Sequence, residues 1–380
     1  MKIALVKQEI YQDLYVCPVT ERDAARILFS SNMRVGPIGL MAELGADFFI
    51  VKEENEKETQ IYRKVIPHLA DKVKLLKTLP LNKVPGWERR KIGSILSQGE
   101  LAVNGSDIDW GQYDIVISIN ISLPTHTILK YPQTLFAYMI GEANMATFWP
   151  CFGYDAYLNQ NARGIVQQKC GIIDFPYTFL KGDTLQAMMQ PYMPADYKRK
   201  GVFMEINSTK ERPVTKVPDH FKVLEEHGFE VILHQDLIFD NLKNLCRSKY
   251  FVKMGGRTIR GNSAAEAISC GALAIMNRNE VIHKELIIDE CHVTTMEEVL
   301  RLINELEQDE LKYNQLLKKQ KEIVTHYFYD CPLQSIENCL EDKRSRKYTT
   351  KYSSVRKFVD RVSFINKYEI KKKLRLTKNR

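Results

Sequence analysis

The window from Lys253 to Asn277, KMGGRTIRGNSAAEAISCGALAIMN, holds residue types and spacings that suit the binding of an anion. A loop rich in glycine and arginine leads into a small-residue helix that starts at Asn262 or Ser263. Glycines let the backbone approach a ligand, a helix N-terminus attracts negative charge, and arginine adds charge-assisted hydrogen bonds. The window therefore predicts a diphosphate site. Its candidate binding residues are Gly256, Arg257, Arg260, Gly261, Asn262, Ser263 and Glu266.

The spacing of Ser263 and Glu266 has two interpretations. Glu266 lies one turn into the helix, where its carboxylate can accept hydrogen bonds from ribose hydroxyls. Ser-x-x-Glu is also the spelling of an ordinary capping box, which needs no ligand. Two arginines in a glycine loop can likewise form a solvated turn, so the spacing alone leaves these alternatives open.

The same window resembles the C-terminal signature of the GT-B glycosyltransferases. In that family a glycine-rich loop precedes a helix reading Ser-x-x-Glu-Ala-x-x-x-Gly and then a hydrophobic strand. The matching residues here are Gly261, Ser263, Glu266, Ala267, Gly271 and the strand 272–276. The resemblance covers roughly residues 201–330 and implies that Ser263 contacts the phosphates of a nucleotide-sugar and Glu266 its ribose.

The resemblance implies further donor contacts in the same half. After the strand GVFMEIN at 201–207, the family often places a phosphate-binding Arg/Lys pair. The residues at that place are Ser208, Lys210, Arg212 and Lys216. His234 ends another strand and is placed to contact the base, although a strand-end turn explains it equally well. Thr258 stands where many retaining members carry a second carboxylate, so membership of that subgroup is in doubt.

Candidates for catalysis follow two strands of the first half. Doubly wound sheets bind ligands beyond the carboxyl ends of their strands, and an inverting transfer needs a base for the acceptor hydroxyl. Glu142 follows the predicted strand 135–140 and is the first candidate. His126 follows the predicted strand 113–119 and is the second. The alternative for each is a solvated loop residue.

The sequence predicts neither a metal nor a cofactor. The eight cysteines form no CxxC pair or His/Cys cluster at zinc spacing. Asp107 and Asp109 spell Asp-x-Asp, but they lie in a polar, glycine-flanked segment. In a GT-B scheme, basic groups and a helix dipole neutralise the leaving diphosphate, so we expect metal-independent chemistry.

The pattern of apolar runs predicts the α/β class. Short buried strands alternate with helical spacing in both halves, which favours parallel sheets covered on both faces. We expect strands at 1–8, 47–51, 113–119, 135–140, 202–206, 230–234, 250–254 and 273–276, and helices at 38–44, 217–226, 237–246 and 263–270. Thr294 and Thr295, with Glu297 and Glu298, signal the start of a long amphipathic stretch to about Tyr327.

These elements predict a GT-B arrangement of two doubly wound, Rossmann-like domains that face a cleft. We expect an acceptor-side domain at 1–195, a nucleotide-sugar domain at 196–330 and a basic helical tail at 331–380, with a linker near 186–200. A chain of 380 residues is long for a single core, which also favours two domains.

The positive charge is concentrated in the tail. From Lys343 onward there are 15 Lys and Arg against Asp360 and Glu369, so the tail carries +13 and the remainder 8 − 13 = −5. A basic segment with an apolar stripe can lie on an anionic membrane surface, pack on the first domain or lack fixed structure. No apolar stretch approaches the ~20 residues that span a bilayer, and the start lacks signal-peptide features. We therefore expect a cytoplasmic protein, with peripheral membrane contact as one role for the tail.

Together these features predict an enzyme that moves a sugar from a nucleotide-sugar donor to a saccharide or lipid-linked acceptor in surface polysaccharide assembly. The alternatives are a GT-B-fold epimerase or phosphorylase, or a non-catalytic protein that binds a nucleotide or glycan. The body of the chain lacks a nucleic-acid module, so no nucleic-acid partner is expected.

Overall fold

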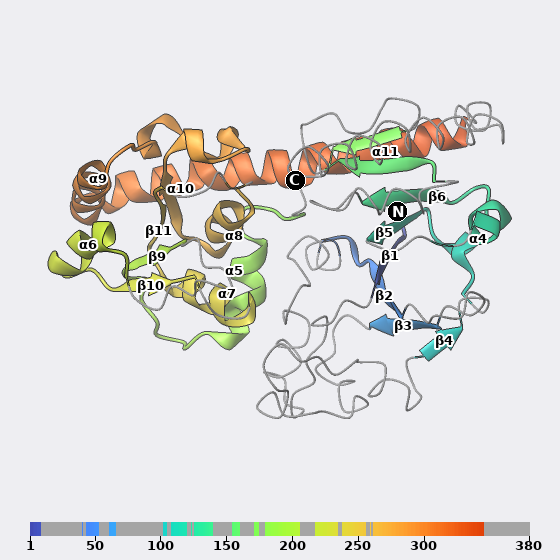
Figure 1. The fold of residues 1–380 in the computed structure, drawn as a ribbon, viewed down its shortest axis with the longest axis horizontal. Coiled ribbons are helices and arrows are strands. Elements are labelled where there is room, and N and C mark those ends of the chain that lie inside the picture. The colour runs from blue at the N-terminus through green and yellow to red at the C-terminus, as the bar shows by residue number, and fades with distance from the viewer. Residues whose placement is uncertain are drawn as a thin grey trace, which may run out of the picture.

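The protein contains two sheets of mostly parallel strands, covered by helices (Figure 1). The computed structural model describes residues 1–8, 40, 43–52, 61–65, 102–104, 108–119, 123, 125–139, 154–159, 171–174, 179–205, 217–234, 238–255, 259 and 261–345. The α/β class predicted from the sequence is confirmed.

The first sheet has eight strands in the order β4-β3-β2-β1-β5-β6-β7-β8. The strands are β1 Ile3–Gln8, β2 Asp47–Lys52, β3 Ile61–Val65, β4 Ala102–Asn104, β5 Ile115–Ile119, β6 Leu135–Met139, β7 Ala156–Asn159 and β8 Gly171–Asp174. The pairs β2–β3 and β3–β4 are antiparallel, and the other neighbours are parallel. The sequence did not predict β3 and β4 at one side of this sheet, or β7 and β8 at the other.

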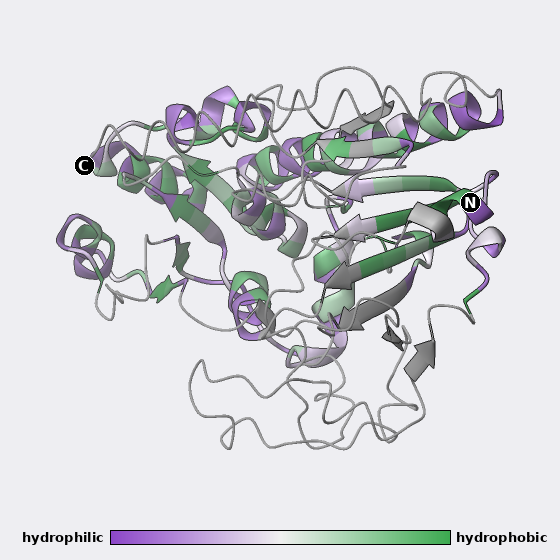
Figure 2. Cartoon of the chain, turned by 45° about the vertical axis from the view of Figure 1, so that its right-hand side comes forward, coloured by the Kyte–Doolittle hydropathy of each residue, from purple (hydrophilic) through white to green (hydrophobic). Residues whose placement is uncertain are grey.

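The centre of the first sheet is buried on both faces. Ile3 and Leu5 of β1 belong to one apolar cluster, whereas Ala4 and Val6 belong to another on the opposite face. Alternate side chains of a strand point to opposite faces, so a continuous apolar run is what a doubly covered strand requires. The hydropathy colouring shows this sheet largely green, the colour of hydrophobic residues (Figure 2).

The second sheet has four parallel strands in the order β10-β9-β11-β12. They are β9 Val202–Met204, β10 Val231–Leu233, β11 Tyr250–Lys253 and β12 Leu273–Met276. The chain passes from β9 to β10 on one side and then returns to the other side of β9 with β11. This reversal between β9 and β11 is a topological switch point, where doubly wound sheets bind their ligands.

Helices on both faces complete the second unit. They are α5 Thr184–Met189, α6 Lys222–Glu226, α7 Ile238–Arg247, α8 Asn262–Cys270, α9 Met296–Gln308 and α10 Glu310–Thr325. Helix α5, which lies within the range predicted for the first domain, packs against α7 and α8. Helix α6 is shorter than expected because the chain first makes a 3-10 turn at Asp219–Phe221, directly after Pro218.

The long amphipathic stretch is two helices instead of one. It starts as predicted, since Thr295 and Glu298 form a complete capping box at the start of α9. Asp309 then leaves the helical conformation, and its carboxylate accepts a hydrogen bond from Lys312 N at 2.9 Å to cap α10. An aspartate that caps a new helix is a local stop signal for the preceding one.

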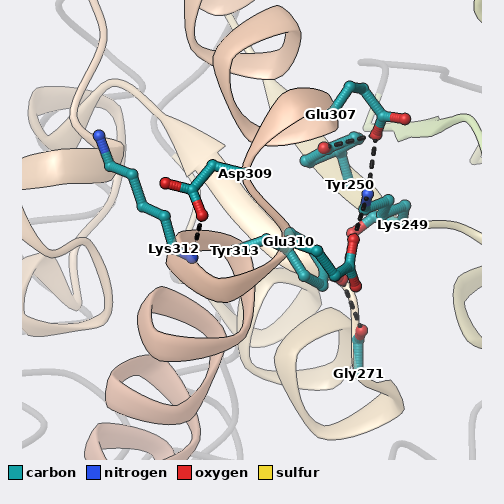
Figure 3. Close-up of polar contacts among 8 residues, drawn as sticks. All are labelled: Lys249, Tyr250, Gly271, Glu307, Asp309, Glu310, Lys312 and Tyr313. Carbon is teal, nitrogen blue, oxygen red and sulfur yellow. Dashed lines mark hydrogen bonds and ion pairs between the residues drawn. The ribbon is translucent and has the colours of Figure 1, made fainter.

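A polar cluster holds the α9–α10 junction against the second sheet (Figure 3). The Lys249 ammonium lies 3.0 Å from both Glu307 and Glu310. Burial lowers the pKa of Lys249, but the two carboxylates outweigh it and the net pKa is raised. The Tyr313 hydroxyl reaches the carbonyl oxygens of Lys249 at 3.0 Å and Gly271 at 3.4 Å. These contacts join α10 to the chain just before β11 and β12.

The chain then returns to the first sheet. A π-helical turn, His326–Asp330, links α10 to α11 Cys331–Arg344, and α11 packs on β8 and β6 (Figure 1). Lys343 pairs with Asp155 at 2.7 Å, with both side chains largely buried. The first part of the predicted tail is therefore a helix on the first sheet, and residues 346–380 lie outside the described residues. None of the described helices is long and apolar enough to cross a bilayer.

Replacing Tyr313 with phenylalanine should destabilise the protein. The buried Gly271 carbonyl would lose the hydroxyl donor, and the Lys249 carbonyl would keep only the Leu273 N–H, which together cost about 1–2 kcal/mol of unfolding free energy. Urea denaturation measures the change. The control Tyr327→Phe, at an exposed tyrosine, should change the unfolding free energy by less than about 0.5 kcal/mol. Equal effects of the two substitutions would contradict the role given to the Tyr313 hydroxyl.

Candidate functional site

The carboxyl edge of the second sheet gathers polar residues at the switch point. Glu205 directly follows β9, Lys253 ends β11, and His234 follows β10. The His234 N–H donates to the Met204 carbonyl at 3.0 Å, and the Glu205 N–H donates to the Val252 carbonyl at 3.1 Å. Strand pairing therefore continues one residue past the strands and holds these three side chains at one edge.

Helix α8 begins at this edge with a residue that must be glycine. Gly261, the N-cap, has φ +108°, in the left-handed region that favours glycine. A Cβ there would lie 2.8 Å from Val281 Cγ1 and 3.0 Å from Leu286 Cδ1. Behind it, Ala264, Ala265 and Ala267 are fully buried. Small residues let the start of α8 lie close to its neighbours.

The capping-box interpretation of Ser263 and Glu266 is wrong. The N-cap is Gly261, without a side-chain cap, and Ser263 is already the second residue of the helix. Its hydroxyl donates to the Glu205 carboxylate, in a short hydrogen bond between the helix start and the end of β9. Ser263 is thus free of a capping role and lies at the carboxyl edge of the sheet.

A buried ion pair fixes the start of the loop before α8. The Lys253 side chain is 2% exposed, and its ammonium lies 2.5 Å from the Glu280 carboxylate and 2.7 Å from the Gly255 carbonyl oxygen. The other oxygen of Glu280 accepts from the Gly255 N–H at 3.0 Å. A buried charge needs a partner and further hydrogen bonds, and this arrangement supplies both.

The end of the same loop is fixed by backbone pairing. The Ile259 N–H donates to the Glu280 carbonyl at 2.9 Å, and the Ile282 N–H donates to the Ile259 carbonyl at 2.8 Å. The segment around Glu280 therefore holds the loop from both ends. In the sequence, Gly256 and Arg257 come between these anchors and Arg260 follows Ile259; all three are outside the described residues.

The first turn of α8 offers unsatisfied polar groups. The amide oxygen of Asn262 is buried and has no hydrogen-bond partner in the described part of the chain. The first N–H groups of any helix lack partners within the helix and carry the positive end of its dipole. His283 lies beside Gly261, with its ring edge-on to Phe328 at 5.4 Å between centroids. The N–H groups and the positive end of the dipole suit an anion, whereas the Asn262 oxygen is an acceptor and suits a donor such as a hydroxyl.

The end of α8 is as constrained as its start. Gly271 has φ +91°, and a Cβ there would lie 2.6 Å from an Arg199 nitrogen. Arg199 donates to the carbonyls of Cys270 at 2.5 Å and Ser248 at 3.3 Å, which satisfies the ends of α8 and α7. Burial strongly raises the pKa of the Cys270 thiol and lowers that of the nearby Lys321 ammonium. This end of the helix is structural.

The structure brings some of the predicted donor residues together. Gly261, Asn262, Ser263 and Glu266 share the first turns of α8, and His234 lies at the same sheet edge. Ser208, Lys210, Arg212 and Lys216 lie outside the described residues. The sequence interpretation missed Glu205, Lys253, Glu280 and His283. A lysine at the end of an apolar strand was a usable signal for Lys253, whereas nothing in the sequence marks Glu280 as its partner.

The catalytic candidates belong to the first sheet. The order in which the chain adds strands to this sheet reverses between β1 and β5. His126 is the second residue of α4, Thr125–Lys130, the helix that follows β5 in the sequence. Tyr154 fixes this connection, since its hydroxyl donates to Ser118 Oγ at 2.6 Å and accepts from the Leu123 N–H at 2.9 Å. Glu142 lies outside the described residues. The backbone of His126 is therefore at a switch point, as a ligand-binding position requires.

Asp109, the second aspartate of the Asp-x-Asp sequence, has a structural role. Its carboxylate caps a 3-10 turn by accepting from the Gly111 N–H at 3.0 Å. Among the described residues, no group of three or more His, Cys, Asp or Glu side chains has an arrangement that could hold a metal ion.

No protein-family model matches the chain, and no curated protein matches it in sequence. The two sheets of mostly parallel strands, covered by helices, agree with the α/β class predicted from the sequence, and α10 and α11 carry the chain from the second sheet back to the first. Among solved structures, the chain is similar to the DNA-modifying enzyme β-glucosyltransferase, with 11% identity, TM-score 0.40, and coverage of 91% of this chain and 98% of that one.

Two further solved structures are similar to the chain at comparable sequence identity and TM-score. Sucrose-phosphate synthase from Thermosynechococcus elongatus has 12% identity and TM-score 0.38, with 92% and 99% of the two chains covered. A putative UDP-N-acetylglucosamine 2-epimerase from Listeria monocytogenes has 12% identity and TM-score 0.36, with 90% and 96% covered. These similarities are too distant to bear on activity, which must be argued from the residues of this chain.

Replacing Gly261 with alanine should destabilise the second unit. The left-handed conformation costs a non-glycine residue about 1–2 kcal/mol, and the new methyl group would also press on Val281 and Leu286. Gly228→Ala is a matched control, because Gly228 has φ +84° and open space around its Cβ position. Thermal unfolding should show the larger loss for Gly261→Ala. Equal losses would mean that the start of α8 is not tightly packed.

Proposed function

We propose that the protein transfers a sugar from a nucleotide-sugar donor to a saccharide or lipid-linked acceptor. The observation that carries the proposal is the start of α8 at the switch point of the second sheet. There the left-handed Gly261, the first-turn N–H groups and the Ser263 hydroxyl face the place where this fold binds ligands. A diphosphate is the anion that such a turn stabilises as a leaving group.

Each donor group has a proposed partner. The diphosphate accepts hydrogen bonds from the first-turn N–H groups, the Ser263 hydroxyl and the loop arginines Arg257 and Arg260. The ribose hydroxyls donate to Glu266, and the base contacts His234. Ser208, Lys210, Arg212 and Lys216 add positive charge from the neighbouring loop. The Ser263 hydroxyl donates to the Glu205 carboxylate, so donor binding would exchange this acceptor for a phosphate oxygen.

The acceptor side belongs to the first sheet. Glu142, or His126 as the second candidate, deprotonates the attacking hydroxyl while the diphosphate leaves from the anomeric carbon. The positive end of α8 and the basic loop neutralise the leaving group, so the transfer proceeds without a metal. Assembly of a surface polysaccharide at the membrane is the setting that fits a lipid-linked acceptor and the basic segment after Arg344.

Donor binding and turnover test this proposal together. A thermal-shift screen with UDP, GDP, CMP and dTDP should show one nucleotide that raises the unfolding temperature, since a ligand that binds only the native state stabilises it. The matching nucleotide-sugar should then release free nucleotide, faster with an acceptor present. Affinity without release would support a binding protein instead, and an isomerised or phosphorolysed sugar would support an epimerase or phosphorylase.

Replacing Glu266 with alanine should weaken donor binding. Lost hydrogen bonds to the ribose leave its hydroxyls unsatisfied, which costs about 1–3 kcal/mol, or roughly five- to 150-fold in Kd. Isothermal titration with the nucleotide from the screen measures this change. Glu226→Ala, at an exposed position on α6, is the control and should bind normally. An unchanged Kd in the folded Glu266 variant would remove the carboxylate from the donor site.

A further inference from the structure

A cavity lies at the end of the second sheet opposite to the start of α8. It has a volume of about 460 Å³. It is lined by Pro194, Asp196, Tyr197, Lys198, Lys200, Glu230, Ile232, Lys243 and Arg247. Lys200 and Glu230 precede β9 and β10, and Arg247 ends α7, so these residues lie at the amino edge of the strands. The cavity is therefore separate from the carboxyl edge where Glu205 and Ser263 lie.

The lining of this amino-edge cavity is positively charged. Four lysines and arginines face two carboxylates, which gives 4 − 2 = +2. Lys200 pairs with Glu230 at 3.0 Å. For Lys198 and Arg247, no carboxylate of the described residues lies within ion-pair distance. Two cations at the cavity thus form no ion pair with a described carboxylate.

Several surface cations elsewhere on the second unit have acidic partners. Lys222 pairs with Asp219 at 2.6 Å, and Lys319 pairs with Glu290 at 2.7 Å. Arg278 pairs with Asp289 at 2.5 Å. What distinguishes Lys198 and Arg247 is that they line one cavity together.

The backbone fixes where these cations point. Arg199 is partly buried and donates to the carbonyls of Ser248 and Cys270, whereas Lys198 and Lys200 on either side of it are exposed. The Lys200 N–H donates to the Arg247 carbonyl at 2.9 Å, which ties this segment to the end of α7. The cations therefore come from two segments that are held together by hydrogen bonds.

The cavity also has an apolar wall. Tyr197 and Ile232 are both partly buried and pack against the main hydrophobic core. A tyrosine ring beside cations offers a flat surface to the organic part of a ligand. A cavity of about 460 Å³ is within the usual size range of small-molecule sites.

We propose that the amino-edge cavity binds a small organic molecule with two or more negative charges, such as a phosphate ester. Arg247 and Lys198 bind the anionic groups. The planar guanidinium of Arg247 can donate two parallel hydrogen bonds, and the ammonium of Lys198 supplies a compact positive charge. Tyr197 and Ile232 contact the organic part. This site does not depend on the proposed glycosyl transfer, because it uses none of the residues assigned to the donor.

Lysine acetylation with a residue-specific readout tests the site in the full-length chain. The protein is treated briefly with an acetylating reagent in 150 mM NaCl, with and without inorganic pyrophosphate, and each lysine is quantified by mass spectrometry. Acetylation of Lys198 and Lys243 should fall about tenfold when pyrophosphate is present at ten times its Kd. Lys222 and Lys318, which are exposed and do not line the cavity, should be unaffected. Equal protection of all four lysines, or none, would overturn the proposal.

A matched pair of variants tests the ligands themselves. In Arg247→Gln, pyrophosphate should protect Lys243 at least fivefold less than in the wild type, whereas Lys318→Gln should leave protection unchanged. Because Arg247 ends α7 and its loss can disturb folding, Lys198→Glu at an exposed position serves as a second variant. Protection of Lys243 that persists in both folded variants, or that chloride at equal ionic strength reproduces, would refute the site. Pyrophosphate bound at α8 does not interfere, since the readout is local to the cavity.

Discussion

The close packing of α8 is the constraint on which the rest of the second unit depends. The helix contacts α5, α7, α10 and β12, and its buried face is made of alanine and other small or apolar residues. A helix enclosed in this way must begin and end sharply, and both ends use a left-handed glycine, Gly261 and Gly271. Larger residues at either end would press on Val281 or Arg199, which are themselves fixed by the surrounding chain.

This packing aims the positive end of α8 at the switch point between β9 and β11. The Lys253–Glu280 pair and the backbone pairing of Ile259 hold the preceding loop at both ends. The chain then carries α10 and α11 back to the first sheet, where His126 follows β5 at the corresponding reversal of strand order. One chain thus carries the proposed anion site at the edge of one sheet and the candidate base His126 after a strand of the other.

The sequence was informative wherever the signal was local. The strand 273–276 and the capping box at Thr295 were predicted correctly, and helix α8 was predicted to within one residue, because apolar runs, caps and glycine stops act over a few residues. Long-range pairing was not predictable. The contacts of Glu280 with Lys253 and of Glu205 with Ser263 join residues 27 and 58 positions apart. No local sequence pattern indicates which distant residue each of them contacts. The strands β3, β4, β7 and β8 were also missed.

Hydrogen exchange at the start of α8 tests the central claim most directly. Peptides that contain residues 261–266 are followed in deuterated buffer, with and without the nucleoside diphosphate that stabilises the protein, and with the parent nucleoside as control. If the first-turn amides hold a diphosphate, the diphosphate should slow their exchange strongly and the nucleoside should not. Unchanged exchange at these amides, under conditions in which the nucleotide is bound, would show that it binds elsewhere and would contradict the account.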